Sequence, residues 1–451
     1  MERLTKDYPV FDCDAHVTES PRIWSDYMTA QEREIVRPWF YPDAEGWIHV
    51  NGVRALPATW AKGRSSLQGF HQEERRMPNR AEIGGPGVNK KVLRKLFTMK
   101  LTEEQVEYTE HKGARDPKAR LVDMDIQGID QVVVIPLMMF GAYLFVEHAQ
   151  ASAIVARAYN DWVHDWCSTA PDRLFPAAVL PSADPVMAAR ELRRVAAKGF
   201  KVAMLRPVDA GGRYPNHPRF APLWKAFEET QVVVAMHSLP RALIPSLNPS
   251  MTQLSAGDFL FRSLSRHQLR EPCEPLGFIY EAMVWLPQVL LSGFFEDYPG
   301  VTRMAIMESN ATWVPLLLEQ CDKAFHLYRN ERKRRATRLP SELYFERCFS
   351  SFESDETLVY RQHKYFESVG IWASDAYHHD GSDAWEAIRE MREAGVPLDV
   401  EQKFMGANAR RMYRIEPKMY TKSQPAPIER PAWYPKAEEI KREFAELTAR
   451  R

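Results

Sequence analysis

The stretch FDCDAHVTE, residues 11–19, lies almost at the N-terminus and carries an acid and an imidazole two positions apart. Apolar residues at its start and just before it, among them Tyr8 and Val10, predict a short strand. Side chains at positions i and i+2 of a strand point to the same side. Asp14 and His16 would therefore project together, as two ligands of one metal ion must. Taken alone, the stretch could also be a polar strand end, so the rest of the chain has to decide.

The composition excludes several classes of protein. The chain has 451 residues, 45% of them hydrophobic and 11% aromatic, which is enough for a large core. The chain has 60 basic residues (lysine and arginine) and 60 acidic residues (aspartate and glutamate), so its formal net charge is zero. The charge therefore gives no indication of binding to nucleic acid or to an anionic membrane. Five scattered cysteines favour a reducing compartment. Neither a membrane span of roughly 20 apolar residues nor a signal peptide is evident, so we expect a cytoplasmic protein.

From residue 114 onward, apolar strands alternate with helices. Residues 8–13 count as the first of eight predicted strands. The other seven are expected at residues 130–136, 173–181, 200–205, 232–237, 301–307, 348–352 and 371–374. Near-continuous apolar strands separated by helices indicate a parallel sheet covered on both faces, and eight such units predict a (β/α)8 TIM-type barrel. The competing doubly wound sheet usually has a glycine-rich phosphate turn after its first strand, and none is present.

Two segments lie outside this repeat, within what we expect to be one barrel domain spanning residues 1–451. Residues 20–113 predict a long insertion after strand one, either a lid or a peripheral packed segment. Within it, Asn51-Gly52 between apolar residues predicts a small hairpin. Residues 416–451 predict a C-terminal arm that ends in an amphipathic helix and packs on the barrel or on a second subunit.

Functional side chains of such barrels lie at the carboxyl ends of the strands. The predicted strand ends carry Asp14, His16 and Glu19 (strand one), Arg206 (strand four), His237 (strand five), Glu308 (strand six), and Asp375 and His378 (strand eight). Imidazoles and carboxylates that meet at one barrel mouth suit Zn²⁺, Mn²⁺ or Fe²⁺. Three or four protein ligands leave a position open for water or substrate.

Several motifs resemble those of one family. They are DPKARLVDMDIQGID (116–130), YNDW (159–162), PDRL (171–174), FAPLW (220–224), ESNATWVP (308–315) and SDAYH (374–378). Together with the first-strand motif they resemble the amidohydrolase superfamily. More narrowly, they resemble the amidohydrolase-related group that contains aminocarboxymuconate semialdehyde decarboxylase, γ-resorcylate decarboxylase and related C–C hydrolases. The resemblance covers residues 8–20 and 115–415 and is specific for the family, though not for a substrate.

The resemblance implies a metal site with four ligands: Asp14 and His16 on the first strand, His237 on the fifth and the acid Asp375 on the last. It implies one divalent transition metal, zinc first, with manganese or iron as alternatives. Glu19 matches an acidic position after the first motif, where it could orient His16 or form a salt bridge. A homodimer or higher homo-oligomer that acts on a small molecule is the implied assembly.

One position departs from the group. Its well-studied decarboxylases carry a histidine at the end of strand six, where this chain has Glu308. A second histidine of the γ-resorcylate type falls near Trp285. Glu308 could be a general base, a bridge to a second metal or a buried hydrogen-bond anchor. His378 or His379 could supply the missing imidazole, so proton handling should differ from theirs.

Three hypotheses follow. The first is hydrolysis of an amide, ester or C–C bond in a small aromatic or cyclic carboxylate, with metal-activated water and Asp375 moving the proton. The second is non-oxidative decarboxylation of an aromatic or unsaturated acid, with Asp375 protonating the carbon. The third is a barrel without catalysis that acts as a binding protein. Arg206 could bind a substrate carboxylate, and Trp313 and Tyr377 could contact a flat ligand, although salt-bridge and core roles stay open.

Overall fold

A computed structural model of the chain describes the barrel and most of its covering helices. The described residues are 4–44, 47–57, 112–137, 145–181, 183–206, 216–238, 274–331, 336–378, 381–425 and 429–436, with a few single residues between and after them.

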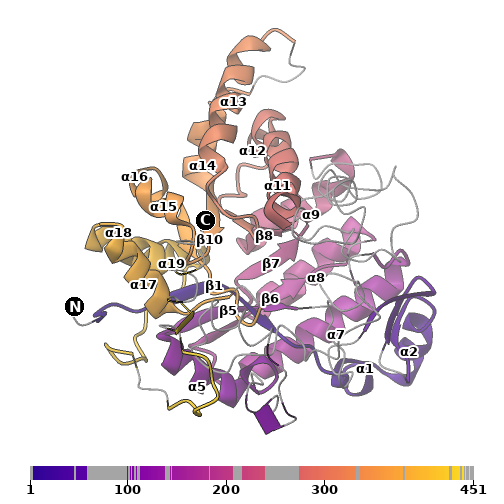
Figure 1. The fold of residues 1–451 in the computed structure, drawn as a ribbon. Coiled ribbons are helices and arrows are strands. Elements are labelled where there is room, and N and C mark those ends of the chain that lie inside the picture. Colours follow the sequence, from indigo (N-terminus) through magenta and orange to yellow (C-terminus); the bar gives the residue numbers. More distant parts are fainter. Residues whose placement is uncertain are drawn as a thin grey trace.

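Eight parallel strands form one sheet that curls into a nearly closed barrel (Figure 1). In chain order they are β1 (Phe11–Val17), β5 (Gln131–Pro136), β6 (Leu174–Val179), β7 (Val202–Leu205), β8 (Val233–His237), β9 (Met304–Met307), β10 (Cys348–Phe352) and β11 (Gly370–Trp372). Each strand pairs with the next in the same direction. The predicted (β/α)8 barrel is confirmed, and each of the eight predicted strands is present.

Helices between the strands cover the barrel, and none of those described is long and apolar enough to cross a bilayer. The α-helices from α5 onward are α5 (Pro117–Gln127), α7 (Ala149–Cys167), α8 (Pro185–Ala197), α9 (Ala221–Thr230), α11 (Glu274–Leu291), α12 (Phe294–Asp297), α13 (Val314–Leu327), α14 (Pro340–Arg347), α15 (Thr357–Arg361), α16 (His363–Phe366), α17 (Ala384–Glu393), α18 (Leu398–Gln402) and α19 (Asn408–Tyr413). The described residues also form two short 3-10 helices, Lys112–Ala114 and Pro218–Phe220, and a π-helical turn, Lys403–Ala407.

Local chemistry sets the helix ends. The carboxylate of Asp116 accepts the amide of Lys118 at the start of α5, and Asp184 caps α8 in the same way. A proline follows each cap, where its missing N–H costs nothing. Helix α5 ends at Gly128, whose φ is +76°, and a Cβ at this position would lie 2.7 Å from the Trp385 ring. Glycine is therefore required there for both backbone conformation and space.

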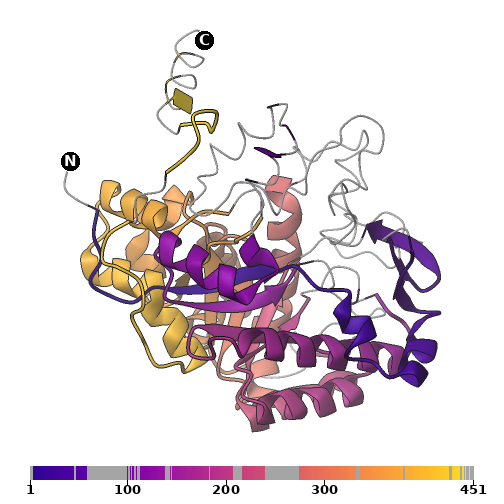
Figure 2. The same cartoon turned by 90° about the horizontal axis from the view of Figure 1, so that it is seen from below.

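The segment after β1 is more regular than its sequence indicated. It contains α1 (Arg22–Ser25), α2 (Ala30–Val36) and an antiparallel sheet of β2 (Phe40–Pro42), β3 (Trp47–Val50) and β4 (Val53–Pro57). Figure 2 shows this small sheet beyond the end of α7. The predicted hairpin is confirmed, because Asn51 and Gly52 both have positive φ, as a type I′ turn requires. Sequence analysis missed α2, although Thr29 and Glu32 form a capping box at its start.

Parts of the predicted insertion and arm lie outside the described residues. This holds for residues 58–98 of the insertion and for most of the predicted helix at 437–450. Their roles as lid and packing arm stay predictions. Residues 416–425 do contact the barrel, since the backbone amides of Tyr420 and Thr421 donate to the Asp130 carboxylate, each at 2.7 Å.

The barrel closes between β1 and the residues after β11 without a regular strand ladder. Ala15 and Ala376 form one isolated parallel bridge there. The amide of Asp375 donates to the Asp14 carbonyl at 3.1 Å, and the amide of His16 donates to the Ala376 carbonyl at 2.5 Å. This closure, which we call the seam, brings the first and last strand ends together.

Candidate metal centre

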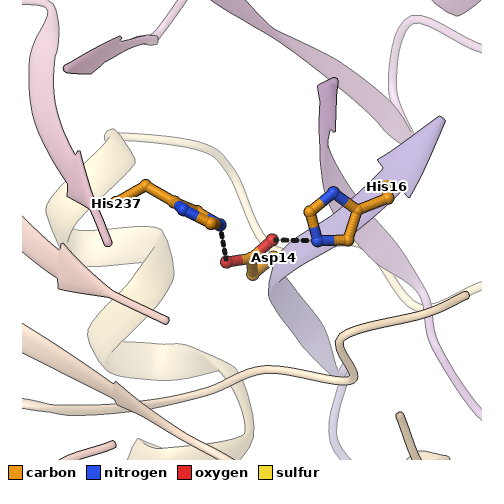
Figure 3. Close-up of side chains that lie close together, drawn as sticks. All are labelled: Asp14, His16 and His237. Carbon is orange, nitrogen blue, oxygen red and sulfur yellow. Dashed lines mark ion pairs between the residues drawn. The ribbon is translucent and has the colours of Figure 1, made fainter. Parts of the chain in front are cut away.

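Asp14 lies between two imidazoles at the barrel mouth (Figure 3). Its Oδ1 is 3.8 Å from Nε2 of His16, and its Oδ2 is 3.8 Å from Nε2 of His237. All three side chains are at most 5% exposed. Asp14 and His16 come from β1, and His237 comes from β8. The barrel therefore brings His237 to residues that lie at least 221 positions before it in the chain. The three side chains could hold a metal ion together.

Backbone carbonyls fix both imidazoles in one orientation. Nδ1 of His16 lies 3.1 Å from the Pro136 carbonyl, and Nδ1 of His237 lies 2.9 Å from the Ser238 carbonyl. A carbonyl can only accept, so each Nδ1 carries the proton and each neutral ring turns its Nε2 lone pair toward the carboxylates. This second contact of the ring is typical of metal-binding histidines.

Asp375 joins the same cluster from the segment after β11. Its Oδ1 is 3.0 Å from Nε2 of His16 and 2.7 Å from Nδ1 of His378. The Asp375 side chain is 2% exposed, whereas that of His378 is 21% exposed. His378 therefore connects a buried acid to the solvent-accessible mouth. His379, the other histidine considered from sequence, lies outside the described residues.

Glu308 and Glu353 bring two further carboxylates to the site, from the ends of β9 and β10. Their oxygens and one of Asp375 all lie within 4.8 Å of one another. Sequence analysis missed Glu353, although it directly follows a predicted strand and the rule of strand ends applies to it. Glu308 and Asp375 both have positive φ, at 54° and 49°. Non-glycine residues rarely adopt this conformation, and it is often retained at functional sites.

The electrostatics of the cluster favour a bound cation. Burial raises the pKa of Asp14 well above its usual range, and the charges of Asp12 and Glu353 act in the same direction. Burial lowers the pKa of His237 to about 3 and that of His16 to well below its usual range, with His378 adding to both shifts. The imidazoles are therefore neutral at neutral pH. A cation would compensate the crowded carboxylates and use the lone pairs, and imidazoles with carboxylates suit a divalent transition metal.

The three residues predicted to contact substrate all have partners within the protein. Nη2 of Arg206 donates to the buried Glu281 at 2.9 Å. Nε1 of Trp313 donates to the Ser309 carbonyl at 2.6 Å, and the hydroxyl of Tyr377 donates to Asp123 at 2.7 Å. These contacts hold the three side chains in place. Direct contact with substrate stays a prediction for all three.

The described contacts of the His16 ring are with the Pro136 carbonyl and Asp375. Sequence analysis offered Glu19 either for orienting His16 or for a salt bridge, and its role stays a prediction. Glu19 is buried after β1, and its charge adds to the burial that raises the pKa of Tyr159 on α7. A backbone carbonyl on the neighbouring strand orients the ring, which no sequence motif can indicate.

A family model for amidohydrolases matches residues 11–415, nearly the whole described barrel. The chain belongs to the amidohydrolase family. The prediction of an enzyme of this family is thereby confirmed. Among curated relatives of this amidohydrolase is the γ-resorcylate decarboxylase of Rhodococcus jostii (strain RHA1), 30% identical over 156 residues, which are 33% of this chain and 43% of the relative. The match therefore spans less than half of that relative.

Solved structures share the fold of this amidohydrolase. An amidohydrolase from Mycobacterium avium subsp. paratuberculosis K-10 has a TM-score of 0.67 at 18% identity, covering 90% of this chain and 100% of that one. The 5-carboxyvanillate decarboxylase of Novosphingobium aromaticivorans DSM 12444, complexed with manganese and 4-hydroxy-3-methoxy-5-nitrobenzoic acid, has a TM-score of 0.59 at 18% identity, covering 92% and 99%. At these identities the likeness establishes the fold alone.

Proposed function

We propose that this amidohydrolase is a metal-dependent decarboxylase that releases CO₂, without oxidation, from an aromatic acid carrying an oxygen next to its carboxylate. The contact between Asp375 and His378 carries the proposal, because it supplies an acid and a proton relay beside the metal donor set. The decarboxylases among its relatives support the same reaction. Hydrolysis, placed first from sequence alone, becomes the second candidate.

Asp14, His16, His237 and Asp375 would hold the metal. A bound divalent cation would attract the substrate carboxylate and its neighbouring oxygen and withdraw electron density from the ring. Zinc was expected first from the sequence, and the manganese in a structural neighbour makes manganese an equal candidate. Metal analysis of the purified protein distinguishes the two.

The chain's own residues account for the proton. Protonated Asp375 would give its proton to the ring carbon that bears the carboxylate, and the carbon–carbon bond would then break. The electron pair of that bond restores the aromatic ring, and CO₂ leaves. His378, 2.7 Å from Asp375 and partly exposed, would return a proton from solvent. One proton is taken up and one CO₂ released for each turnover, so no oxidant is needed.

Arg206 and the aromatic residues would select the substrate. Glu281 compensates the charge of Arg206, and the ring of Phe145 lies 5.1 Å from its guanidinium carbon. A flat aromatic acid could accept a hydrogen bond from this guanidinium in place of one of its present partners. Its carboxylate would then compensate part of the Arg206 charge. We include the rings of Trp313 and Tyr377 in the wall of the proposed substrate pocket.

The test measures the release of CO₂ and the incorporation of a deuteron from solvent into the product. Purified protein loaded with Mn²⁺ or Zn²⁺ is incubated in D₂O with 2,6-dihydroxybenzoate or 5-carboxyvanillate, and with 4-hydroxybenzoate as a control without an ortho oxygen. Decarboxylation yields CO₂ and a product with one deuteron at the vacated carbon. No CO₂ from any ortho-oxygenated acid in a metal-loaded sample would contradict the proposal.

Hydrolysis keeps one supporting observation, the carboxylates of Glu308 and Glu353 beside Asp375, which could accept a proton from water. Amides, esters and lactones of aromatic acids, incubated in ¹⁸O-labelled water, test it. Label in the product without CO₂ release would establish hydrolysis in place of decarboxylation.

The homo-oligomeric state and the cytoplasmic location expected from sequence also stand as proposals. Light scattering of the purified protein tests the oligomeric state.

A further inference from the structure

The proposed metal ligands lie on both sides of the seam. Asp14 and His16 are on β1, and Asp375 follows β11. Other neighbouring strands of the barrel share a ladder of paired residues, whereas the described residues of the seam share one bridge, Ala15 with Ala376. At the ligands, the described backbone hydrogen bonds across the seam are those from Asp375 to Asp14 and from His16 to Ala376, so side-chain contacts across the seam can add to what sets the distance between the ligands.

Asp12 spans the seam beneath the ligands. Its side chain is fully buried, and its Oδ1 accepts the amide of Ser374 at 2.9 Å and the amide of Asp14 at 3.2 Å. Its Oδ2 accepts the hydroxyl of Ser374, and that hydroxyl accepts the amide of Ala376 at 3.0 Å. One carboxylate thus binds backbone amides on both sides of the seam, adjacent to Asp375 and at Asp14 itself.

We propose that Asp12 and Ser374 form a positioning pair that sets the separation of Asp14 and His16 from Asp375, and so the affinity and geometry of the metal centre. The proposal rests on the metal centre of the proposed function. No local sequence motif indicates this role for Asp12, because its partner Ser374 is 362 positions away. Outer partners that hold ligands in place typically change metal affinity by about 10- to 100-fold when they are removed.

Ser374→Ala and Asp12→Asn test the pair. Ser374→Ala removes the hydroxyl bridge and leaves backbone bonds in place, so it should fold even if the Asp12 variant does not. Ser350→Ala is the matched control, because Ser350 is a fully buried strand serine whose hydroxyl bonds Tyr344 instead. The dissociation constant of Mn²⁺ is measured on metal-free protein against a chromophoric chelator. The visible spectrum of the Co²⁺-loaded protein reports ligand geometry independently of stability.

We expect Mn²⁺ to bind about 10- to 100-fold more weakly to each variant, with a shifted Co²⁺ spectrum, while the control keeps the wild-type values. Both variants remove the same contact, so the double variant should weaken binding by about as much as one of them. Wild-type affinity and spectrum in folded Ser374→Ala would overturn the positioning pair. A wild-type protein that binds no metal would instead overturn the proposed function, so the two failures are distinguishable.

Discussion

The imidazole rings of His16 and His378 lie against each other, with centroids 3.9 Å apart and planes tilted by 31°. Both rings contact the carboxylate of Asp375, His16 through Nε2 and His378 through Nδ1. His16 is thus a candidate metal ligand, and His378 lies within hydrogen-bond distance of the same Asp375 carboxylate. An imidazole from the eighth strand end thereby lies beside the candidate metal donors, although the sixth strand end carries Glu308.

His378→Gln should reduce turnover by about 10²- to 10⁴-fold, because a positioned proton donor contributes that much to a rate. The Michaelis constant should change little, since the proposed role is proton transfer. Steady-state CO₂ release measures both. His363→Gln is the control, because His363 bonds the Tyr360 carbonyl at 3.0 Å on α16 and takes no part in the site. An unchanged rate in His378→Gln would remove His378 from the mechanism.

His237→Ala should abolish metal binding by the purified protein, because it removes one of the proposed ligands and leaves Asp14 without its second imidazole. Elemental analysis after dialysis gives the metal content. The matched control is His164→Ala, a partly exposed histidine beside Asp165 on α7. If His237→Ala retained the wild-type stoichiometry, the metal would have to lie elsewhere.

Asp130→Asn should destabilise the fold by about 3–5 kcal/mol, because it leaves the buried Lys6 ammonium, now 2.8 Å from the carboxylate, without its partner. Urea unfolding at pH 7 measures the loss. Asp172→Asn is the control, since its pair with Lys418 is exposed and should contribute little.

The same pair predicts a pH dependence. Burial alone would raise the pKa of Asp130, but the charge and hydrogen bond of Lys6 hold it below its ordinary value. The unfolded chain therefore binds the proton more readily than the folded one. The stability from Asp130 is fully present above about pH 4 and is lost as pH falls through the lower folded pKa. The difference between wild type and Asp130→Asn should shrink in that acid range, and a constant difference from pH 7 to pH 2 would contradict this account.

Glu281→Gln should both destabilise the protein and raise the Michaelis constant for an aromatic acid. It removes the buried carboxylate that pairs with Arg206, and breaking a buried pair typically costs about 3–5 kcal/mol; it also disturbs the guanidinium proposed to contact substrate. Unfolding and steady-state kinetics are measured on the same preparation. Glu319→Gln, which breaks the exposed pair with Lys323, is the control. A loss of stability without any change in the Michaelis constant would give Arg206 a purely structural role.

Much of the candidate site could be predicted because functional residues of such barrels lie at strand ends. Asp14, His16, His237 and Asp375 follow or end recognisable apolar strands, and the structure groups the first three together and places Asp375 beside His16. Glu353 was missed because the strand before it, CFSSF, is only weakly apolar. Glu281 was missed because it lies within α11, where a lone carboxylate gives no sign that it is buried against Arg206.

The sequence by itself determined the eight-strand repeat, the family and the residue types of the candidate metal donors, because strand periodicity and local motifs are properties of short segments. Only the tertiary structure decided which groups act together. The Pro136 carbonyl orients His16, Asp375 meets both His16 and His378, and Asp12 holds Ser374 across the seam. These contacts depend on distances between strand ends that are hundreds of residues apart, and barrel closure sets those distances.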